Sequence, residues 1–232
     1  MGILDRLFSS SKNDTEIKSP VNDTPVVVSK MAQVNNEGLC SIPDLPIPFG
    51  YKTSWLAVLC DDENKVLEAL NAQNVRRANW KSGIAHAYKA GDVFVSPVID
   101  EYVLVVGIDS LLEDMDKLNE LGKRLGNLQY FATHRVVDYH GWAKYEAGKL
   151  VRAYCYIGES GEVPVSFGEP TREEIRLGMD NFPVSEEHFD GVDFPDEEDV
   201  IKLAAAWGVD TSFSGGGYMP SLGVVCSVNL SV

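Results

Sequence analysis

The sequence has few cysteines, and they form no metal-binding or redox pair. Cys40, Cys60, Cys155 and Cys226 lie far apart, and the absence of any CxxC spacing excludes a zinc ribbon and a thioredoxin-like motif. Three of the four stand inside apolar, strand-like runs, where a free cysteine packs as a small hydrophobic residue. We therefore expect reduced, buried thiols, as in a cytoplasmic protein.

Long apolar runs are also absent. The N-terminus has no apolar region of the length found in a signal peptide, and no later run is long enough to span a bilayer. The chain begins Met1-Gly2, but Arg6 occupies the position where a myristoylation signal has serine or threonine. These absences predict a cytoplasmic protein without a membrane partner.

Positive charge is scarce. The 232 residues include 20 Lys and Arg against 35 Asp and Glu, for a net charge of −15. A field of this sign repels nucleic acid and anionic membranes, and it attracts cationic partners. The alternative is that the acidic residues serve solubility alone. The charge therefore predicts no nucleic-acid partner and favours a basic protein as the partner to test.

The hydrophobic fraction of 44% is ordinary for a globular protein and is enough for a sizeable core. Residues 1–44 predict a short helix and a flexible linker, and residues 45–232 predict a single α+β domain. Strands are expected at 55–60, 93–99, 102–108, 129–137, 142–145, 150–157 and 223–232, and helices at 61–70, 80–88, 110–126, 171–178 and 195–207. This order predicts a mixed or antiparallel sheet with a ferredoxin-like (split βαβ) core, extended by a β-meander and C-terminal helices.

Three polar residues could carry chemistry if residues 129–140 form one strand. His134, Asp138 and His140 are separated by even numbers of residues and would then share a face. Such a row could bind a metal, or supply a base and the group that orients it. A strand, however, spreads residues by about 7 Å for every two positions, so His134 and Asp138, four positions apart, are too far from each other for one metal ion. A structural role is favoured, no metal or cofactor is expected, and the alternative is a hydrolase that uses this row.

Cys155 is a second candidate for chemistry, as a nucleophile with His134 or His140 as its base on a neighbouring strand. Its own strand face is shared with Ala153 and Ile157, which are apolar. A thiol in the core is therefore favoured over a reactive one.

The stretch 169–202 is distinctly acidic, with twelve Asp or Glu against three Arg or Lys. Its acids lack the DxDxDG order of a calcium-binding loop. Aromatic side chains inside a charged rim suit a protein interface, whereas the alternative is a solvated face with the aromatic rings turned into the core. The expected partner-binding residues are Asp190, Asp193, Asp196, Glu197 and Glu198, with Phe189 and Phe194 as apolar anchors.

Several segments resemble those of an uncharacterised bacterial protein family. They are FGYKxxWLAV at 49–58, VFVxP at 93–97, QYFxTHRVVxYHxWA at 129–143, and PDEEDV at 195–200 followed by AWxV at 206–209. The resemblance spans most of residues 45–210. Members of that family fit the pattern of small immunity-type proteins, so the resemblance implies such a role, and it transfers no activity or catalytic residues.

The leading hypothesis is a non-enzymatic, protein-binding inhibitor. It would be a bacterial immunity protein that neutralises a cognate basic toxin through an acidic surface, since complementary charge increases association rate and specificity. The lack of a strong catalytic motif favours this role over an enzyme. The alternatives are the hydrolase described above and a small-molecule sensor, which needs a sizeable apolar pocket.

Overall fold

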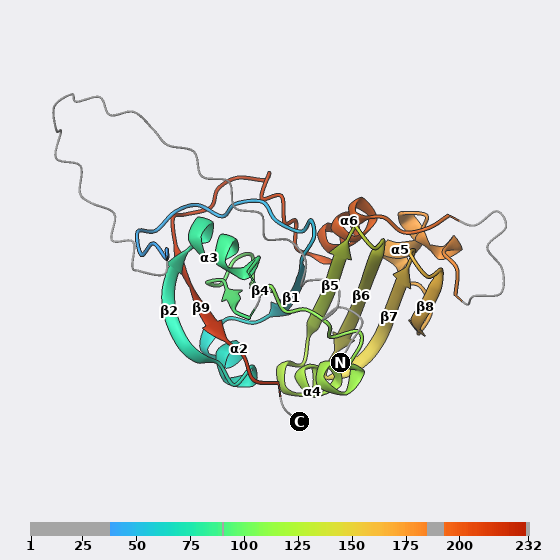
Figure 1. Ribbon diagram of the computed structural model, residues 1–232, viewed down its shortest axis with the longest axis horizontal. Coiled ribbons are helices and arrows are strands. Elements are labelled where there is room, and N and C mark those ends of the chain that lie inside the picture. The colour runs from blue at the N-terminus through green and yellow to red at the C-terminus, as the bar shows by residue number, and fades with distance from the viewer. Residues whose placement is uncertain (1–37, 90, 185–192, 231–232) are drawn as a thin grey trace.

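The computed structural model describes residues 38–89, 91–184 and 193–230, which contain one nine-stranded sheet (Figure 1). All neighbouring strands are antiparallel, in the order β2-β9-β3-β4-β1-β5-β6-β7-β8. The strands are β1 (Ser54–Leu59), β2 (Gln73–Asn79), β3 (Val93–Val95), β4 (Tyr102–Val106), β5 (Leu128–His134), β6 (Tyr139–Glu146), β7 (Lys149–Ile157), β8 (Glu162–Phe167) and β9 (Leu222–Ser227). The helices are α2 (Glu63–Ala69), α3 (Trp80–Ala87), α4 (Met115–Leu125), α5 (Arg172–Arg176), the 3-10 helix η1 (Met179–Asn181) and α6 (Glu197–Trp207). The predicted combination of helices with an antiparallel sheet is confirmed.

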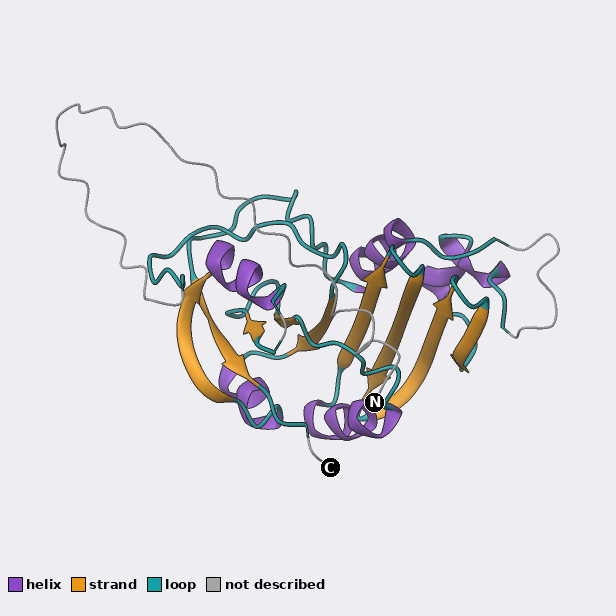
Figure 2. Ribbon diagram, in the orientation of Figure 1, coloured by secondary structure: helices purple, strands orange, loops and turns teal. Residues whose placement is uncertain are grey.

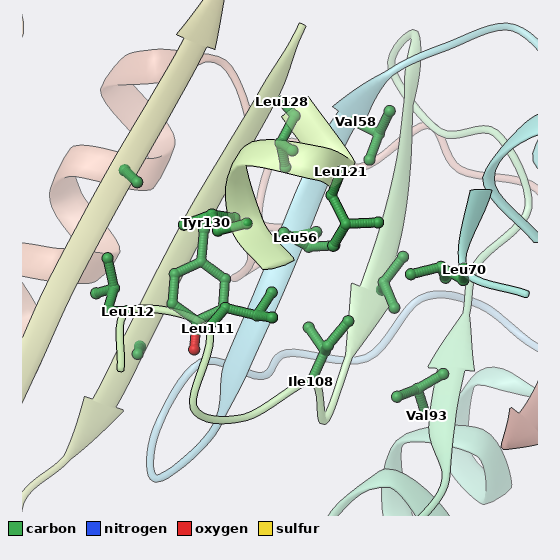
Figure 3. Packing of buried hydrophobic residues seen from close by; sticks show 14 of the residues in the cluster. Leu56, Val58, Leu70, Val93, Ile108, Leu111, Leu112, Leu121, Leu128 and Tyr130 are labelled. Carbon is green, nitrogen blue, oxygen red and sulfur yellow. The ribbon is translucent and has the colours of Figure 1, made fainter. Parts of the chain in front are cut away.

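Helices cover both faces of the sheet, because its strands carry apolar residues on both sides. In β1, Leu56 packs in the layer with α2 and α4, whereas Trp55 packs in the layer with α3 and α6. In the view of Figures 1 and 2, α3 and α6 lie along the upper side and α2 and α4 along the lower side. Figure 3 shows the first of these layers, in which Leu111 lies beside the ring of Tyr130. The sheet therefore separates two buried cores.

Two helices come close to the sheet at a glycine. A Cβ on Gly83 of α3 would lie 2.2 Å from the Phe94 ring of β3. A Cβ on Gly122 of α4 would lie 2.2 Å from the Tyr145 ring of β6. Because protein cores are close-packed, neither contact leaves room for a methyl group. These two glycines therefore determine how closely α3 and α4 pack.

Helix α4 begins later than the sequence predicts. The Ser110-x-x-Glu113 pattern predicts a capping box, but Ser110 has a left-handed φ of 62°. The helix begins at Met115, and the N-cap is Asp114, whose carboxylate accepts a backbone N–H of the first turn at 3.3 Å. The predicted start at residue 110 is therefore wrong, and residues 111–113 form a turn that packs on the sheet.

Residues 129–140 form a hairpin rather than one strand. Strand β5 ends at His134 and β6 begins at Tyr139, and these two residues are register partners. The Val137 N–H donates to the His134 carbonyl at 3.2 Å, and Asp138 has a left-handed φ of 53°. The condition under which His134, Asp138 and His140 would share one strand face is therefore not met, because the chain reverses between the histidines.

Strand β9 lies between β2 and β3 in the interior of the sheet. Val224 and Cys226 face the layer of α2 and α4, and Val225 faces the opposite layer. The strand is therefore buried on both faces rather than half-buried as the alternation predicts, and it ends at Ser227. Val232, which belongs to the predicted strand, lies outside the described residues.

The described part of the N-terminal region packs against α3. The Asp44 carboxylate accepts the backbone N–H groups of Trp80 and Lys81 at 2.7 and 3.1 Å. The domain boundary between residues 44 and 45 stays a prediction, and the predicted short helix lies outside the described residues. Within the part of the chain that the structure describes, no helix has both the length and the apolar character needed to cross a membrane.

Candidate functional site

Two segments that are distant in the sequence meet at one end of the sheet: the β5–β6 turn at 135–138 and the chain entering α6 (Figure 1). Tyr156 of β7 connects them. It is the register partner of His140, and its ring centroid lies 5.1 Å from that of Phe194. Burial, together with the charge of Asp138, raises the pKa of Tyr156. The histidine segment and the acidic segment, which are rival sites in the sequence, therefore belong to one region.

His140 and Asp138 form the polar contact of this region. His140 is 1% exposed, and its Nε2 lies 3.0 Å from Oδ1 of Asp138, whose side chain is 54% exposed. The Nδ1 atom of His140 is buried and has no hydrogen-bond partner among the described residues. Burial raises the pKa of Asp199 in α6, and His140 acts on this pKa in the opposite direction. The imidazole therefore lies within electrostatic range of two carboxylates, one from the turn and one from the helix.

His134 does not join this pair. It is the register partner of Tyr139, and His140 is the next residue along β6, so the two histidines lie on opposite faces of the hairpin. The proposed catalytic row of His134, Asp138 and His140 therefore does not assemble, although Asp138 and His140 do make contact. Among the described residues, no group of three His, Cys, Asp or Glu side chains could hold a metal ion.

Some of the acids expected to bind a partner have structural roles at the start of α6. Asp196 is the N-cap, and it forms a capping box with Asp199 in which each carboxylate accepts the other residue's backbone N–H, at 2.9 and 3.1 Å. Glu197 is 8% exposed, and its Oε1 accepts the Lys52 N–H at 3.1 Å. Glu197 thus faces the chain around residue 52 and is poorly placed to touch a partner.

Asp193, Phe194 and Glu198 remain at the surface. Phe194 is 41% exposed, and Asp193 is exposed beside it. Glu198 is exposed, and its carboxylate lies 3.5 Å from the Lys202 ammonium, a surface pair of the kind that contributes little. Phe189 and Asp190 lie outside the described residues.

Further exposed apolar residues in this part of the chain are not evident from the sequence. Ile175 and Val184 are 54% and 66% exposed, whereas Phe182 is buried against Trp142 and Tyr154. Helix α5 has five residues, which is too short for its sequence to show which side faces solvent. In the sequence, an aromatic residue is therefore a clearer signal of an apolar anchor than Ile175 or Val184. Phe182, however, is an aromatic residue of the core.

Pro183, which precedes Val184, and Phe194 contact neighbouring positions of β7. The Tyr154 hydroxyl donates to the Pro183 carbonyl at 2.9 Å, and Tyr156 packs against Phe194. Tyr154 and Tyr156 are two residues apart, so they share a strand face and lie about 7 Å from each other. We define the acidic surface as Val184, Asp193, Phe194 and Glu198.

A buried ion pair fixes α5 beside this surface. The Arg152 Nε lies 2.9 Å from Glu174 Oε1, and the two side chains are 4% and 0% exposed. The Trp142 Nε1–H donates to the same oxygen at 2.9 Å, and Glu174 Oε2 accepts the Thr171 N–H at 2.7 Å. Arg152 also donates to the Gly168 carbonyl at 3.0 Å. Because both charges have several partners, the acidic surface stands next to a rigid base.

Cys155 is a core residue, as the sequence predicts. It is 1% exposed, and burial raises its pKa to about 12. It packs in the layer of α2 and α4, whereas the His140 partner Tyr156 packs in the opposite layer. A thiolate nucleophile activated by His140 is therefore excluded by both position and charge state.

Two hollows lie beside α4, at the opposite end of the sheet. One has a volume of about 630 Å³ and includes Lys65, Glu68 and Arg124 in its wall, and the other has about 530 Å³ and includes Asp116 and Lys123. Both are open and lined by charged side chains. Neither has the enclosed apolar character that a small-molecule sensor needs.

No protein-family model, curated protein or solved structure matches this chain. The resemblance to an immunity-type family therefore rests on the sequence segments alone.

Proposed function

We propose that the protein is a non-enzymatic, protein-binding inhibitor of the immunity type, and that it neutralises a cognate basic toxin through the acidic surface. The observation that carries this proposal is Phe194, a 41% exposed aromatic ring that packs on Tyr156, in a segment in which Asp193 and Glu198 are exposed as well. Aromatic anchors inside a charged rim are typical of the residues that dominate protein interfaces.

The charge of the whole chain supports the same kind of partner. A net charge of −15 accelerates the approach of a cationic protein and slows that of nucleic acid. The exposed carboxylates then act at short range, where they discriminate between partners. Binding that depends on such charges weakens as salt screens them.

Affinity capture tests the proposal. The tagged protein is used as bait in an extract of its source organism at about 50 mM and about 500 mM salt, and retained proteins are quantified by mass spectrometry. We expect one basic protein in stoichiometric amount, released at the higher salt concentration. The purified partner should lose its toxic activity when the wild-type protein is added.

A matched pair of baits locates the binding surface. Asp193→Lys/Glu198→Lys reverses two charges of the acidic surface, and Asp116→Lys/Glu120→Lys reverses two charges on α4. The first variant should lose the partner and its neutralising effect, and the second should keep both. Equal retention by the two variants, or the absence of a basic partner, would contradict the proposed function.

We also propose that the centre of the sheet is a ferredoxin-like, split βαβ core. It is supported by the neighbour order β3-β4-β1-β5 and by α2 and α4, which pack on the same face. Strands β9 and β2 with α3 extend this core on one side, and the meander β6-β7-β8 extends it on the other.

A further inference from the structure

Exposed apolar side chains are concentrated around α5 and η1. Of the fifteen large apolar side chains that are exposed among the described residues, five lie between positions 167 and 194: Phe167, Ile175, Leu177, Val184 and Phe194. Single apolar residues on a surface are ordinary, whereas several in one short stretch are typical of an interaction site. The concentration therefore favours a docking surface in this part of the molecule.

The side of residues 171–184 that faces the sheet is filled. Glu174, Met179 and Phe182 are buried there, and the last two pack in the layer of α3 and α6. The apolar side chains that stay in solvent therefore lie on the outer side of the segment. They are 54%, 39% and 66% exposed, and we define them as the α5 platform: Ile175, Leu177 and Val184.

The platform is fixed to the rest of the fold at its start, middle and end. At the start, the Trp207 Nε1–H donates to the Thr171 hydroxyl at 3.2 Å. In the middle, the buried carboxylate of Glu174 is held by its ion pair with β7. At the end, the Tyr154 hydroxyl donates to the carbonyl of the residue before Val184 at 2.9 Å. Apolar side chains on a backbone held in this way lose little conformational entropy when a partner covers them.

The platform is continuous with the acidic surface, because Val184 belongs to both. The residue before Val184 contacts Tyr154, and Phe194 contacts Tyr156 on the same face of β7. The exposed charged residues close to the platform in the sequence have both signs: Glu169, Arg172, Arg176 and Asp180. The platform therefore adds apolar contact area rather than net charge, and the acidic surface supplies the attraction for a basic protein.

We propose that the basic partner places an aliphatic segment on the α5 platform, and that this contact slows dissociation of the complex while the acidic surface accelerates its formation. The inference rests on the proposed function and names the apolar part of the same interface. Charges at the rim of an interface act chiefly on the association rate, whereas desolvated apolar contacts act chiefly on the dissociation rate. Variants of the two surfaces should therefore differ in which rate they change.

Biolayer interferometry measures both rates, with the basic protein captured by the wild-type bait as the probe and salt at about 50 and about 500 mM. Ile175→Ser/Val184→Ser removes two aliphatic side chains of the platform. It should speed dissociation about tenfold at both salt concentrations and change association less than about twofold. Asp193→Lys/Glu198→Lys should slow association instead, and most strongly at the lower salt concentration.

Matched controls separate the platform from exposed apolar residues in general. Val75→Ser/Val98→Ser removes two valines that are 48% and 40% exposed outside the platform, and both rates should stay within about twofold of the wild type. Ile175→Leu keeps an aliphatic side chain and should behave in the same way. If Ile175→Ser/Val184→Ser unfolds at a lower temperature than the wild type, Val184→Ser alone, at a position outside any helix, gives the same test.

Wild-type dissociation rates in Ile175→Ser/Val184→Ser and in Val184→Ser would overturn the platform and leave the proposed function standing. If sedimentation shows that the free protein is a dimer, and the same substitutions dissociate it, the platform belongs to a second copy of the chain and the inference is overturned as well. A wild-type bait that retains no basic protein would overturn the proposed function and the inference together.

Discussion

At the scale of residues, the position of α5 on the sheet depends on the buried ion pair between Arg152 and Glu174. Removing two charges from water is unfavourable, and here a tryptophan N–H and backbone groups supply the additional hydrogen bonds that such a pair needs. The pair connects β7 to α5 directly. Its integrity therefore determines whether α5 and the chain leading to Val184 stay in position.

Neutralising one member of this pair should be strongly destabilising. Glu174→Gln preserves the shape but leaves the Arg152 charge buried without a counter-charge, so we expect the free energy of unfolding to fall by about 3 kcal/mol. Urea denaturation measures this change. The double variant Arg152→Met/Glu174→Leu should lie closer to the wild type, because no buried charge remains. If the Glu174→Gln protein were as stable as the wild type, Arg152 and Glu174 would not act as a buried pair of opposite charges.

Carboxylates that look alike in the sequence have different environments in the fold. The spacing of Thr171 and Glu174 predicts the capping box at α5, and the structure confirms it. The sequence gives no sign that Glu174 also pairs with Arg152, 22 residues away. Glu197 likewise meets Lys52 across 145 residues. The spacing of residues along the chain therefore predicts the helix caps. Which carboxylates are buried and which stay exposed to a partner is decided by tertiary contacts.

At the scale of elements, the strands that the sequence does not predict are the two edges of the sheet. Strand β2 reads QNVRRAN and β8 reads EVPVSF, with Pro164 inside it. An edge strand need not alternate in hydrophobicity because it is partly exposed, and proline is tolerated there. The histidine row is misread for a related reason: the turn RVVD contains no glycine or proline to mark it, and Asp138 itself adopts the left-handed conformation.

Helix α3 provides a test of what sets the distance between a helix and the sheet. Alanine at position 83 is favoured over glycine by helix propensity by about 1 kcal/mol, but its Cβ would overlap the fully buried Phe94 ring. Overpacking of this kind costs about 1–3 kcal/mol, so we expect Gly83→Ala to destabilise the protein in thermal or urea unfolding.

Two controls separate packing from propensity in α3. Lys81→Ala, at an exposed position of the same helix, should be within about 0.5 kcal/mol of the wild type. In a Phe94→Leu background the loss caused by Gly83→Ala should shrink, because the ring has gone. A stabilising Gly83→Ala would mean that the helix can move away from β3.

At the scale of the whole molecule, the two ends of the sheet differ in what they present. The end with α6 carries Phe194, Asp138 and the exposed acids of the acidic surface (Figure 1). The end with α4 carries two open hollows whose walls hold charges of both signs, the cations of Lys65, Lys123 and Arg124 and the carboxylates of Glu68, Asp116 and Glu120. Under the proposed function, the net charge of −15 attracts a basic partner, and the exposed carboxylates of the acidic surface at the first end receive it.

Hydrogen–deuterium exchange of the complex with the captured basic partner tests this account most directly. Peptides that cover 135–140 and 193–202 should exchange at least about fivefold more slowly in the complex than in the free protein, and peptides that cover 115–125 should be unchanged. Protection confined to α2 and α4, with the α6 end exchanging as in the free protein, would contradict the account.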